Sequence, residues 1–441
     1  MNDRMPTYSS QDLSTRLALW AAALSFVVRL AVVFVLGTWH VPADGDHWAF
    51  GYEMGRIARS IAEGRGYISP FGTGEPTAWM PPLYPYLLSG VFSIFGVYSP
   101  ASAIVILVIQ CAIGAATVFI LYALACRWAG RRAAVIAAFG FAIYPPAVYF
   151  SGGIVSSSPL SVLLTAMTLL LAQVYRETAR IGTVLSAGLV ASLTALLDPV
   201  SLVLLPCILY AILRAPTSLA TRLRVSLIAV IVAVVVLTPW TVRNYIVFGT
   251  WVPIKSNLGQ ELAGSLNDHV ARRKCGESGP SVFETMSPSE KELTAGMDEV
   301  VLNQWLLKRA LHWARAHPRR VLELSLCRAA QFWWQTDFGA ALEQAMRHGG
   351  PLAKTALALS YPAILVLAVG GLILAYWQGR PVGSAALFFL LYPLIYYVRL
   401  ITLYRYRYPL EPFLLIFAAL AMASLSRYPR VDTPGSSYPN E

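Results

Sequence analysis

The sequence predicts an all-α polytopic membrane protein, a bundle of about ten transmembrane helices with two large loops on one side. Of its 441 residues, 56% are hydrophobic and only 13% are charged, whereas soluble domains carry about 25% charged residues. Several apolar runs approach or exceed the roughly 20 residues that a helix needs to cross a bilayer. This composition excludes an ordinary soluble globular protein.

Ten apolar segments are expected to be the transmembrane helices. The first is longer than the apolar part of a signal peptide, and no small-residue cleavage site follows it, so we expect it to be retained. The ten segments are residues 17–36, 101–126, 133–150, 156–175, 181–197, 199–213, 225–242, 356–377, 383–398 and 409–425.

The short links between these segments predict the orientation. The links opposite the basic ones, at residues 151–158 and 197–199, contain no Lys or Arg. Because basic links stay in the cytoplasm, both termini are expected there. The net charge of +11 therefore reflects topology, and no nucleic-acid partner is expected. The basic links are residues 127–132, 176–180, 214–224 and 378–380.

Two further apolar segments are expected to lie on the outer side without crossing. Residues 81–98 begin with prolines, and counting them as a span would move the next basic link outside. We expect an interfacial or re-entrant helix there. Residues 321–336 are amphipathic and rich in tryptophan, and we expect a second interfacial helix.

The chain is expected to form a single membrane domain over residues 1–441. Residues 1–242 would form the core module, with an outer loop at 37–100. The four expected parts are the core module 1–242, the large outer loop 243–355 with its interfacial helices, the C-terminal transmembrane helices 356–426 and a disordered tail 427–441.

The first outer loop contains an acidic stretch that predicts a helix over about residues 46–63. Asp44 or Asp46 stands where an N-cap belongs, and glycines follow the helix. Asp46 and Glu53 are two turns apart, so they would share one face, about 10 Å apart along the axis. The alternative is a solvated helix with a capping aspartate. The aromatic residues among the charges favour a polar surface beside a membrane.

Four arginines stand at predicted outer ends of spans. Arg243 closes the seventh span, where snorkelling to the interface is the default interpretation. Arg399, Arg405 and Arg407 place three cations in one short outer link, against the positive-inside trend. An anionic ligand at the outer surface would explain them.

Asp198 and Arg29 are charged residues within or next to predicted spans. Asp198 precedes a proline and is predicted to be the N-cap of the next span. Arg29 lies deep in the first span, where a charge marks either a functional site or a packing contact.

The cysteines predict no metal site, because no CxxC-type spacing occurs. Cys111, Cys126 and Cys207 fall in apolar spans and are expected to be packing residues. Cys275 and Cys327 share the long outer loop and would form a disulfide if that loop faces an oxidising compartment.

Several motifs resemble one family. They are "IARSIAEGRGY", "PTAWMPPLYPYLL", "TPWTVRNYIVFGTWVPIKSNLG" and "YRYRYPLEP". With the large loops after spans one and seven, they resemble the GT-C glycosyltransferases that depend on polyprenyl phosphate, of the bacterial family 39 type. That group includes the protein O-mannosyltransferases and the lipid A aminoarabinose transferases.

The resemblance implies a GT-C-type helical bundle with its active site on the periplasmic or outer face of the inner (plasma) membrane. It implies a polyprenyl-phosphate-linked sugar donor and a lipid, glycan or protein acceptor, within membrane lipids. A carboxylate base would drive inverting transfer. A polyprenyl-lipid or polysaccharide flippase and a non-catalytic assembly protein remain the alternatives. No cofactor is assigned, and the paired carboxylates leave a divalent metal ion open.

The resemblance also implies roles for individual residues. The chain departs from the family pattern at Phe50 and Gly51, where the family places an acidic residue, and at Met80, where some members place a lysine. Asp46 is expected to be the base ahead of Glu53. The implied site comprises the acids Asp44, Asp46 and Glu53; the phosphate-binding residues Arg56, Arg59, Arg243, Arg399, Arg405 and Arg407; and the substrate-lining residues His47, Trp48, Trp79, Tyr84 and Asn257.

Overall fold

The computed structural model describes residues 8–41, 50–272, 281–334, 350–399 and 404–425. Within these ranges the regular elements are helices. Extended pairing there is limited to two isolated bridges, Phe50 with Val155 and Ile68 with Pro76. The all-α prediction is confirmed.

Each of the ten predicted spans contains a helix. Five described helices are long and apolar enough to cross a membrane, and a pair bent by 53° makes a sixth if it is counted as one span. Others are shorter than predicted: α8 has 15 residues and reaches only about 22 Å. The ten segments are α1 (Tyr8–Val35), α4 (Pro100–Trp128), α5 (Arg131–Ile143) with α6 (Pro145–Val148) and η1 (Tyr149–Gly153), α7 (Ser158–Thr178), α8 (Ile181–Ala195), η2 (Pro199–Val203) with α9 (Leu204–Leu213), α10 (Leu219–Phe248), α17 (Gly350–Trp377), α18 (Gly383–Leu391) with α19 (Leu394–Val398), and α21 (Glu411–Leu425).

Local sequence signals explain the ends and the close packing of these helices. The Ser99 hydroxyl accepts a hydrogen bond from the backbone N–H of Ser102 at 3.0 Å, and Pro100 opens α4. Where α17 packs against α21, a Cβ on Gly371 would lie 1.8 Å from the carbonyl oxygen of Phe417. Small residues let membrane helices approach this closely.

The bend after α5 is stabilised by Arg29 of α1. Pro145 and Pro146 have no N–H, so they cannot bond the carbonyls of Phe141 and Ala142 four residues earlier. The Arg29 guanidinium donates to both, at 3.3 Å and 2.8 Å, and it is fully buried. Of the two interpretations of Arg29, the structure supports the packing contact.

The helix of the first outer loop begins later than predicted. α2 spans Glu53–Ala62. The expected helix from about residue 46 is therefore wrong over residues 50–52, which precede α2 and are not helical. Gly51 and Tyr52 have φ angles of +86° and +58°, which a right-handed helix does not allow. Phe50 is buried and pairs with Val155 instead. Asp44 and Asp46 lie outside the described residues.

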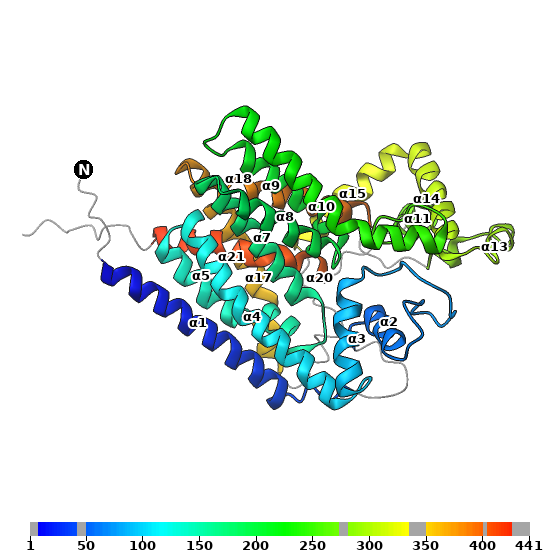
Figure 1. The fold of residues 1–441 in the computed structure, drawn as a ribbon, viewed down its shortest axis with the longest axis horizontal. Helices are drawn as coiled ribbons and strands as arrows, with labels where there is room; N and C mark the ends of the chain where they lie inside the picture. Colours follow the sequence, from blue (N-terminus) through cyan, green and yellow to red (C-terminus); the bar gives the residue numbers. More distant parts are fainter. Residues whose placement is uncertain (1–7, 42–49, 273–280, 335–349, 400–403, 426–441) are drawn as a thin grey trace, which may run out of the picture.

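The elements that are predicted to lie on the outer side gather at one end of the bundle. In Figure 1, α2, α3, α11, α13 and α14 lie at the right-hand end, and α1 starts at the left-hand end. The two predicted interfacial segments are helical, as α3 and α15. The remaining elements are α3 (Leu83–Phe95), α11 (Leu258–Ser265), α12 (Asp268–Ala271), η3 (Val282–Thr285), α13 (Pro288–Thr294), α14 (Glu299–Ala316), α15 (Pro318–Trp334), α20 (Tyr404–Arg407) and η5 (Tyr408–Leu410).

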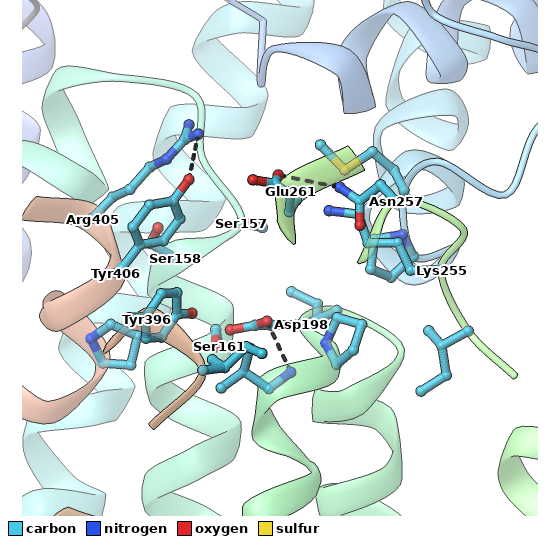
Figure 2. Close-up of a pocket in the computed structure, with 18 of the residues that line it drawn as sticks. Ser157, Ser158, Ser161, Asp198, Lys255, Asn257, Glu261, Tyr396, Arg405 and Tyr406 are labelled. Atoms are coloured by element: carbon cyan, nitrogen blue, oxygen red, sulfur yellow. Dashed lines mark hydrogen bonds between the residues drawn. The ribbon is translucent and has the colours of Figure 1, made fainter. Parts of the chain in front are cut away.

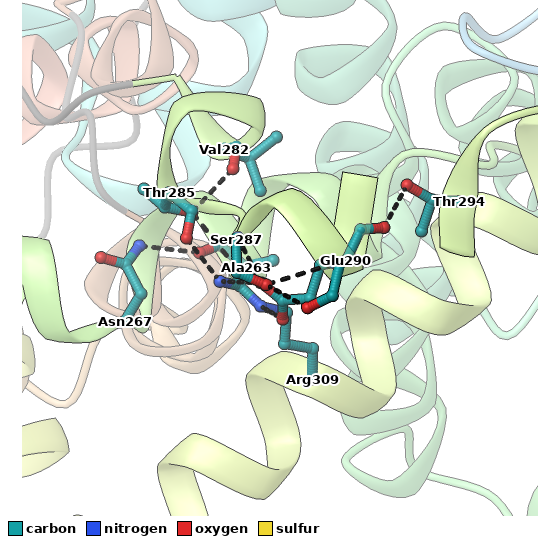
Figure 3. Close-up of polar contacts among 9 residues, drawn as sticks. Ala263, Asn267, Val282, Thr285, Ser287, Glu290, Thr294 and Arg309 are labelled. Carbon is teal, nitrogen blue, oxygen red and sulfur yellow. Dashed lines mark hydrogen bonds and ion pairs between the residues drawn. The ribbon is translucent and has the colours of Figure 1, made fainter. Parts of the chain in front are cut away.

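The second outer region has a small core of its own. Ala263 of α11, Val282 of η3 and Leu306 of α14 are buried together. Figure 3 shows Arg309 of α14 between two segments: its Nε donates to Glu290 Oε1 at 2.9 Å, and its Nη2 donates to the Thr285 carbonyl at 2.8 Å. The predicted outer elaboration is therefore a folded unit. Cys327 of α15 is disulfide-bonded, whereas Cys275 lies outside the described residues.

Candidate active site

A cavity of about 1170 Å³ lies where the predicted outer loops meet. Each part of its wall belongs to, or borders, a loop that the pattern of basic links places outside. Segments far apart in the sequence therefore converge on one space. The wall includes residues from 51–54, 79–81, 149–161, 197–203, 253–262, 391–399 and 405–409.

Glu53 is the predicted acid that the structure places in the cavity wall. It is the first residue of α2, directly after the turn at Gly51 and Tyr52. The turn is close-packed: a Cβ on Gly55 would lie 2.0 Å from the carbonyl oxygen of Phe50. Glycine at 55 is thus required for α2 to start here, and this start fixes Glu53 at the cavity.

Asp198 is a second carboxylate of the wall. Its Oδ1 accepts the N–H of Val200 at 3.2 Å, so the predicted N-cap is confirmed. Its Oδ2 accepts a hydrogen bond from the Tyr392 hydroxyl at 3.3 Å. Burial raises the pKa of Asp198 above its ordinary value, an effect only partly offset by the Val200 hydrogen bond. The sequence predicted Asp198 as an N-cap but did not predict that it would line the cavity.

Arg399 and Glu261 form an ion pair across the wall. Arg399 Nη2 donates to Glu261 Oε1 at 2.7 Å, and Nε lies 2.6 Å from Oε2. The guanidinium also lies over the Tyr406 ring, 4.4 Å from its centroid. Arg399, which was predicted to bind phosphate, lines the cavity, but its charge is largely neutralised by Glu261.

Two other cations face the cavity, Arg405 and Lys255. Arg405 lies over the rings of Tyr52 and Tyr406, at 5.1 and 5.2 Å, and donates to the Tyr406 hydroxyl at 3.3 Å. Figure 2 shows Arg405 and Tyr406 across the open space from Lys255 and Asn257, with Asp198 between the two groups.

Lys255 and Glu261 are cavity residues that the sequence did not single out. A signal was present for Lys255, since it breaks the positive-inside pattern in a predicted outer segment, as the arginines of 399–407 do. Nothing in the sequence distinguishes Glu261 from an ordinary acidic residue of the first turn of a helix.

Arg407 and Arg243 were predicted to bind phosphate, but neither lines the cavity. Arg407 is 1% exposed, and its Nε donates to Glu411 Oε1 at 2.9 Å. Arg243 donates to the carbonyls of Thr77 and Tyr67, at 2.8 and 3.2 Å. Both side chains are thus bonded within the protein.

The other predicted site residues fall into three groups. Trp79 and Asn257 line the cavity. Tyr84 is buried outside the wall and donates to Gln110 at 3.1 Å. Arg56 and Arg59 project from α2 outside the wall, Arg56 bonding the Pro70 carbonyl at 3.0 Å. The residues outside the described ranges are Asp44, Asp46, His47 and Trp48.

Glu299, the first residue of α14, ties together two segments of the wall. Its carboxylate accepts hydrogen bonds from the Thr77 hydroxyl, the Ala78 N–H and the Ser256 hydroxyl. Thr77 and Ser256 are buried, and they immediately flank the segments that carry Trp79 and Lys255. The second outer region thereby positions the first outer loop.

The described residues include no group of three His, Cys, Asp or Glu side chains that could hold a metal ion. Of the paired carboxylates Asp46 and Glu53, Asp46 lies outside the described ranges.

Residues 80–242 match the sequence model of the family described as dolichyl-phosphate-mannose-protein mannosyltransferase. No curated protein matches the chain significantly. Among solved structures, the archaeal oligosaccharyltransferase AglB from Archaeoglobus fulgidus, in complex with an inhibitory peptide and a dolichol-phosphate, superposes with a TM-score of 0.55 at 15% identity, over 95% of this chain and 51% of that one. The chain has the GT-C fold.

Other solved structures are similar. The Archaeoglobus fulgidus oligosaccharyltransferase in the apo form gives a TM-score of 0.52 at 14% identity, over 92% of this chain and 50% of that one. ArnT from Cupriavidus metallidurans bound to undecaprenyl phosphate gives 0.38 at 14% identity, over 91% and 77%. The chain spans about half the length of the oligosaccharyltransferases it matches. The superpositions on the oligosaccharyltransferases confirm the fold implied by the sequence resemblance.

Proposed function

We propose that this chain is an integral membrane glycosyltransferase that moves a sugar from a polyprenyl-phosphate donor to an acceptor on the outer face of the membrane. The observation that carries the proposal is that Glu53, Arg405 and Lys255 line the same cavity. The family match over residues 80–242 supports the same reaction class.

The cavity offers separate places for the two ends of a lipid-linked sugar. Leu202, Leu258 and Leu394 belong to its wall and are 38%, 45% and 49% exposed. These apolar side chains suit a prenyl chain that enters from the membrane. The phosphate of the donor would then meet Arg405, whose planar guanidinium matches phosphate oxygens.

The transfer needs one base and a stabilised leaving group. The carboxylate of Glu53 takes the proton from the acceptor hydroxyl as that oxygen attacks the anomeric carbon. The new bond joins the acceptor oxygen to the anomeric carbon, and the bond from that carbon to the phosphate oxygen breaks. The phosphate leaves with the bonding electrons as polyprenyl phosphate. Because the acceptor oxygen attacks from the face opposite the phosphate, the configuration inverts.

Glu53 is our choice of base because it lies in the cavity and electrostatically interacts with both Arg405 and Lys255. Glu261 is less suitable, because it is held by Arg399. Asp198 caps η2 and accepts from Tyr392, which suits a sugar hydroxyl contact better than proton transfer to a mobile acceptor. Asp46 remains the second candidate.

The test is release of polyprenyl phosphate by the purified protein from a panel of polyprenyl-phosphate hexoses, amino sugars and pentoses, with and without chelator. At least one donor should be consumed in the presence of a membrane acceptor extract, and the wild type should exceed Glu53→Gln. A panel that neither protein consumes would contradict the proposed function, whereas equal consumption by both proteins would contradict the role of Glu53 as the base.

A further inference from the structure

Lys255 is held in a fixed position at the cavity by its neighbours in the chain. The carbonyl of Ile254 accepts the indole N–H of Trp240 at 2.8 Å. On the other side, the N–H of Ser256 donates to the Ala78 carbonyl at 2.9 Å, and its hydroxyl bonds Glu299. With the backbone fixed on both sides, the Lys255 side chain lies in the cavity wall, as Figure 2 shows.

The Lys255 ammonium group has no direct partner in the part of the chain that the structure describes. No hydrogen bond or ion pair within 4.0 Å joins it to another described residue, although most other charged groups of the wall have one. Glu261, the acid with the largest attraction for Lys255, already pairs with Arg399. Lys255 is half-buried and its side chain lines the cavity, so an anion bound there would give the ammonium group a direct partner.

The charges around Lys255 come from several elements. Glu53 of α2, Asp198 before η2 and Glu261 of α11 attract it, and Arg399 after α19 repels it. Burial outweighs these attractions and lowers the pKa of Lys255 below its ordinary value. A bound phosphate would favour the charged form and reverse this effect.

We propose that Lys255 binds the phosphate of the lipid donor, across the cavity from Arg405. This step rests on the proposed function for the source of the phosphate. Met80 and Lys255 line the same cavity, and the loop after α10 supplies the cation there.

Binding by this lysine makes phosphate affinity depend on pH. Between the second ionisation of the ligand phosphate, at about pH 6, and the pKa of free Lys255, both groups are charged and the affinity is constant. Above that pKa, binding requires proton uptake, so the affinity falls as the pH rises through the lowered pKa of Lys255. Lys255→Arg should remove this fall within the accessible alkaline range, because arginine stays charged.

The test is equilibrium binding of undecaprenyl phosphate to the purified full chain in detergent, with three other probes beside it. Undecaprenol has the lipid without the phosphate, glucose 1-phosphate has the phosphate without the lipid, and inorganic phosphate has neither lipid nor sugar. The variants are Lys255→Met, Lys255→Arg and, as the control, Lys308→Met, an exposed lysine of α14. Thermal unfolding of each variant checks that the fold is retained.

Lys255→Met should bind undecaprenyl phosphate about tenfold to a hundredfold more weakly, the loss expected for one charge-assisted hydrogen bond. Its affinity for undecaprenol should not change, and Lys308→Met should match the wild type. Unchanged binding of undecaprenyl phosphate by Lys255→Met, or loss of undecaprenol binding in parallel, would overturn the proposal. Tighter binding of glucose 1-phosphate or inorganic phosphate than of the lipid phosphate would overturn the lipid source.

The result separates this proposal from the proposed function. Wild-type protein that binds undecaprenyl phosphate through Lys255 but consumes no donor would contradict sugar transfer and leave the phosphate site standing. If Lys255→Met transfers sugar and binds the donor with wild-type affinity, the phosphate site is contradicted and the proposed function stands.

Discussion

The carboxylate of Glu299 accepts a hydrogen bond from the backbone N–H of Ala78 at 2.9 Å, across 221 residues of sequence. The same carboxylate also accepts from the hydroxyls of Thr77 and Ser256. One side chain of the second outer region therefore connects the first outer loop to the segment that follows α10. Both connected segments form walls of the cavity.

Replacing Glu299 with Ala should destabilise the outer end of the protein. Three buried or half-buried donors would lose their acceptor, and a hydrogen bond to a charged group contributes about 1.5–3 kcal/mol. Glu299→Gln keeps one acceptor oxygen and should lie between Ala and wild type. Thermal unfolding in detergent measures the effect, with Glu292→Ala on the exposed face of α13 as the control. Equal melting temperatures for Glu299→Ala and the control would contradict this role.

Arg407 should be required for folding rather than for donor affinity. Its partner Glu411 is fully buried, and removal of one member of a buried pair costs about 3–5 kcal/mol. Arg407→Ala should therefore lower the melting temperature strongly, whereas Arg405→Ala should keep it and weaken binding of lipid phosphate. The double variant Arg407→Leu with Glu411→Leu should recover much of the loss, because no buried charge remains unpaired.

An Arg407→Ala protein that keeps the wild-type melting temperature but binds lipid phosphate tenfold or more weakly would contradict this prediction. Arg407 would then be a ligand-binding residue.

Asp198 should lower stability at neutral pH. Its folded pKa is raised by burial above the unfolded value of about 3.9, so the folded state binds the proton first as the pH falls. Asp198 therefore destabilises the folded state most above its folded pKa, where it is ionised. This destabilisation disappears as the pH falls through the folded pKa towards 4. Asp198→Asn keeps an N-cap acceptor for Val200 and removes the charge.

The Asn variant should be at least as stable as the wild type at pH 7, and its advantage should vanish near pH 4. Thermal unfolding at the two pH values measures this difference, with Glu292→Gln as the exposed control. An Asp198→Asn protein that is less stable by the same amount at both values would show that the hydrogen bonds outweigh the desolvation.

Periodicity and charge predicted the architecture well because both act along the chain. Apolar length placed helices in all ten predicted spans, and the positive-inside pattern grouped the loops that meet at the cavity. The start of α2 could not be predicted, because it depends on the burial of Phe50 against Val155, 105 residues away. Helical spacing alone placed residues 50–52 in a helix, which the positive φ angles of Gly51 and Tyr52 exclude.

The site was harder to predict than the fold. Arg405, Arg407 and Arg399 look alike in the sequence, yet two of them are paired with acids. Glu411 pairs with Arg407 at the i,i+4 spacing, whereas Glu261 pairs with Arg399 across 138 residues. Lys255 and Glu299 take their roles from contacts between loops. Asp198 was recognised as a cap, which is correct, but a cap can also face a cavity.

The orientation of the bundle can be tested by cysteine labelling. Glu292→Cys on α13 should react with a membrane-impermeant maleimide in intact cells, and Ala220→Cys at the start of α10 should react only after the membrane is opened. Both positions are exposed, and neither forms a helix cap. Labelling of both from the same side would contradict the predicted topology.

The measurement that tests the central claim most directly is turnover by two isosteric variants, Glu53→Gln and Asp46→Asn. Each keeps the shape of the side chain and removes a basic oxygen, and loss of a general base costs about a hundredfold to ten-thousandfold in rate. Glu53 lies in the cavity wall beside the cations, so Glu53→Gln should lose that much turnover while its binding of undecaprenyl phosphate is unchanged. Asp46→Asn should lose far less. A Glu53→Gln protein that transfers sugar at the wild-type rate would contradict the assignment of this cavity as the site of transfer through Glu53.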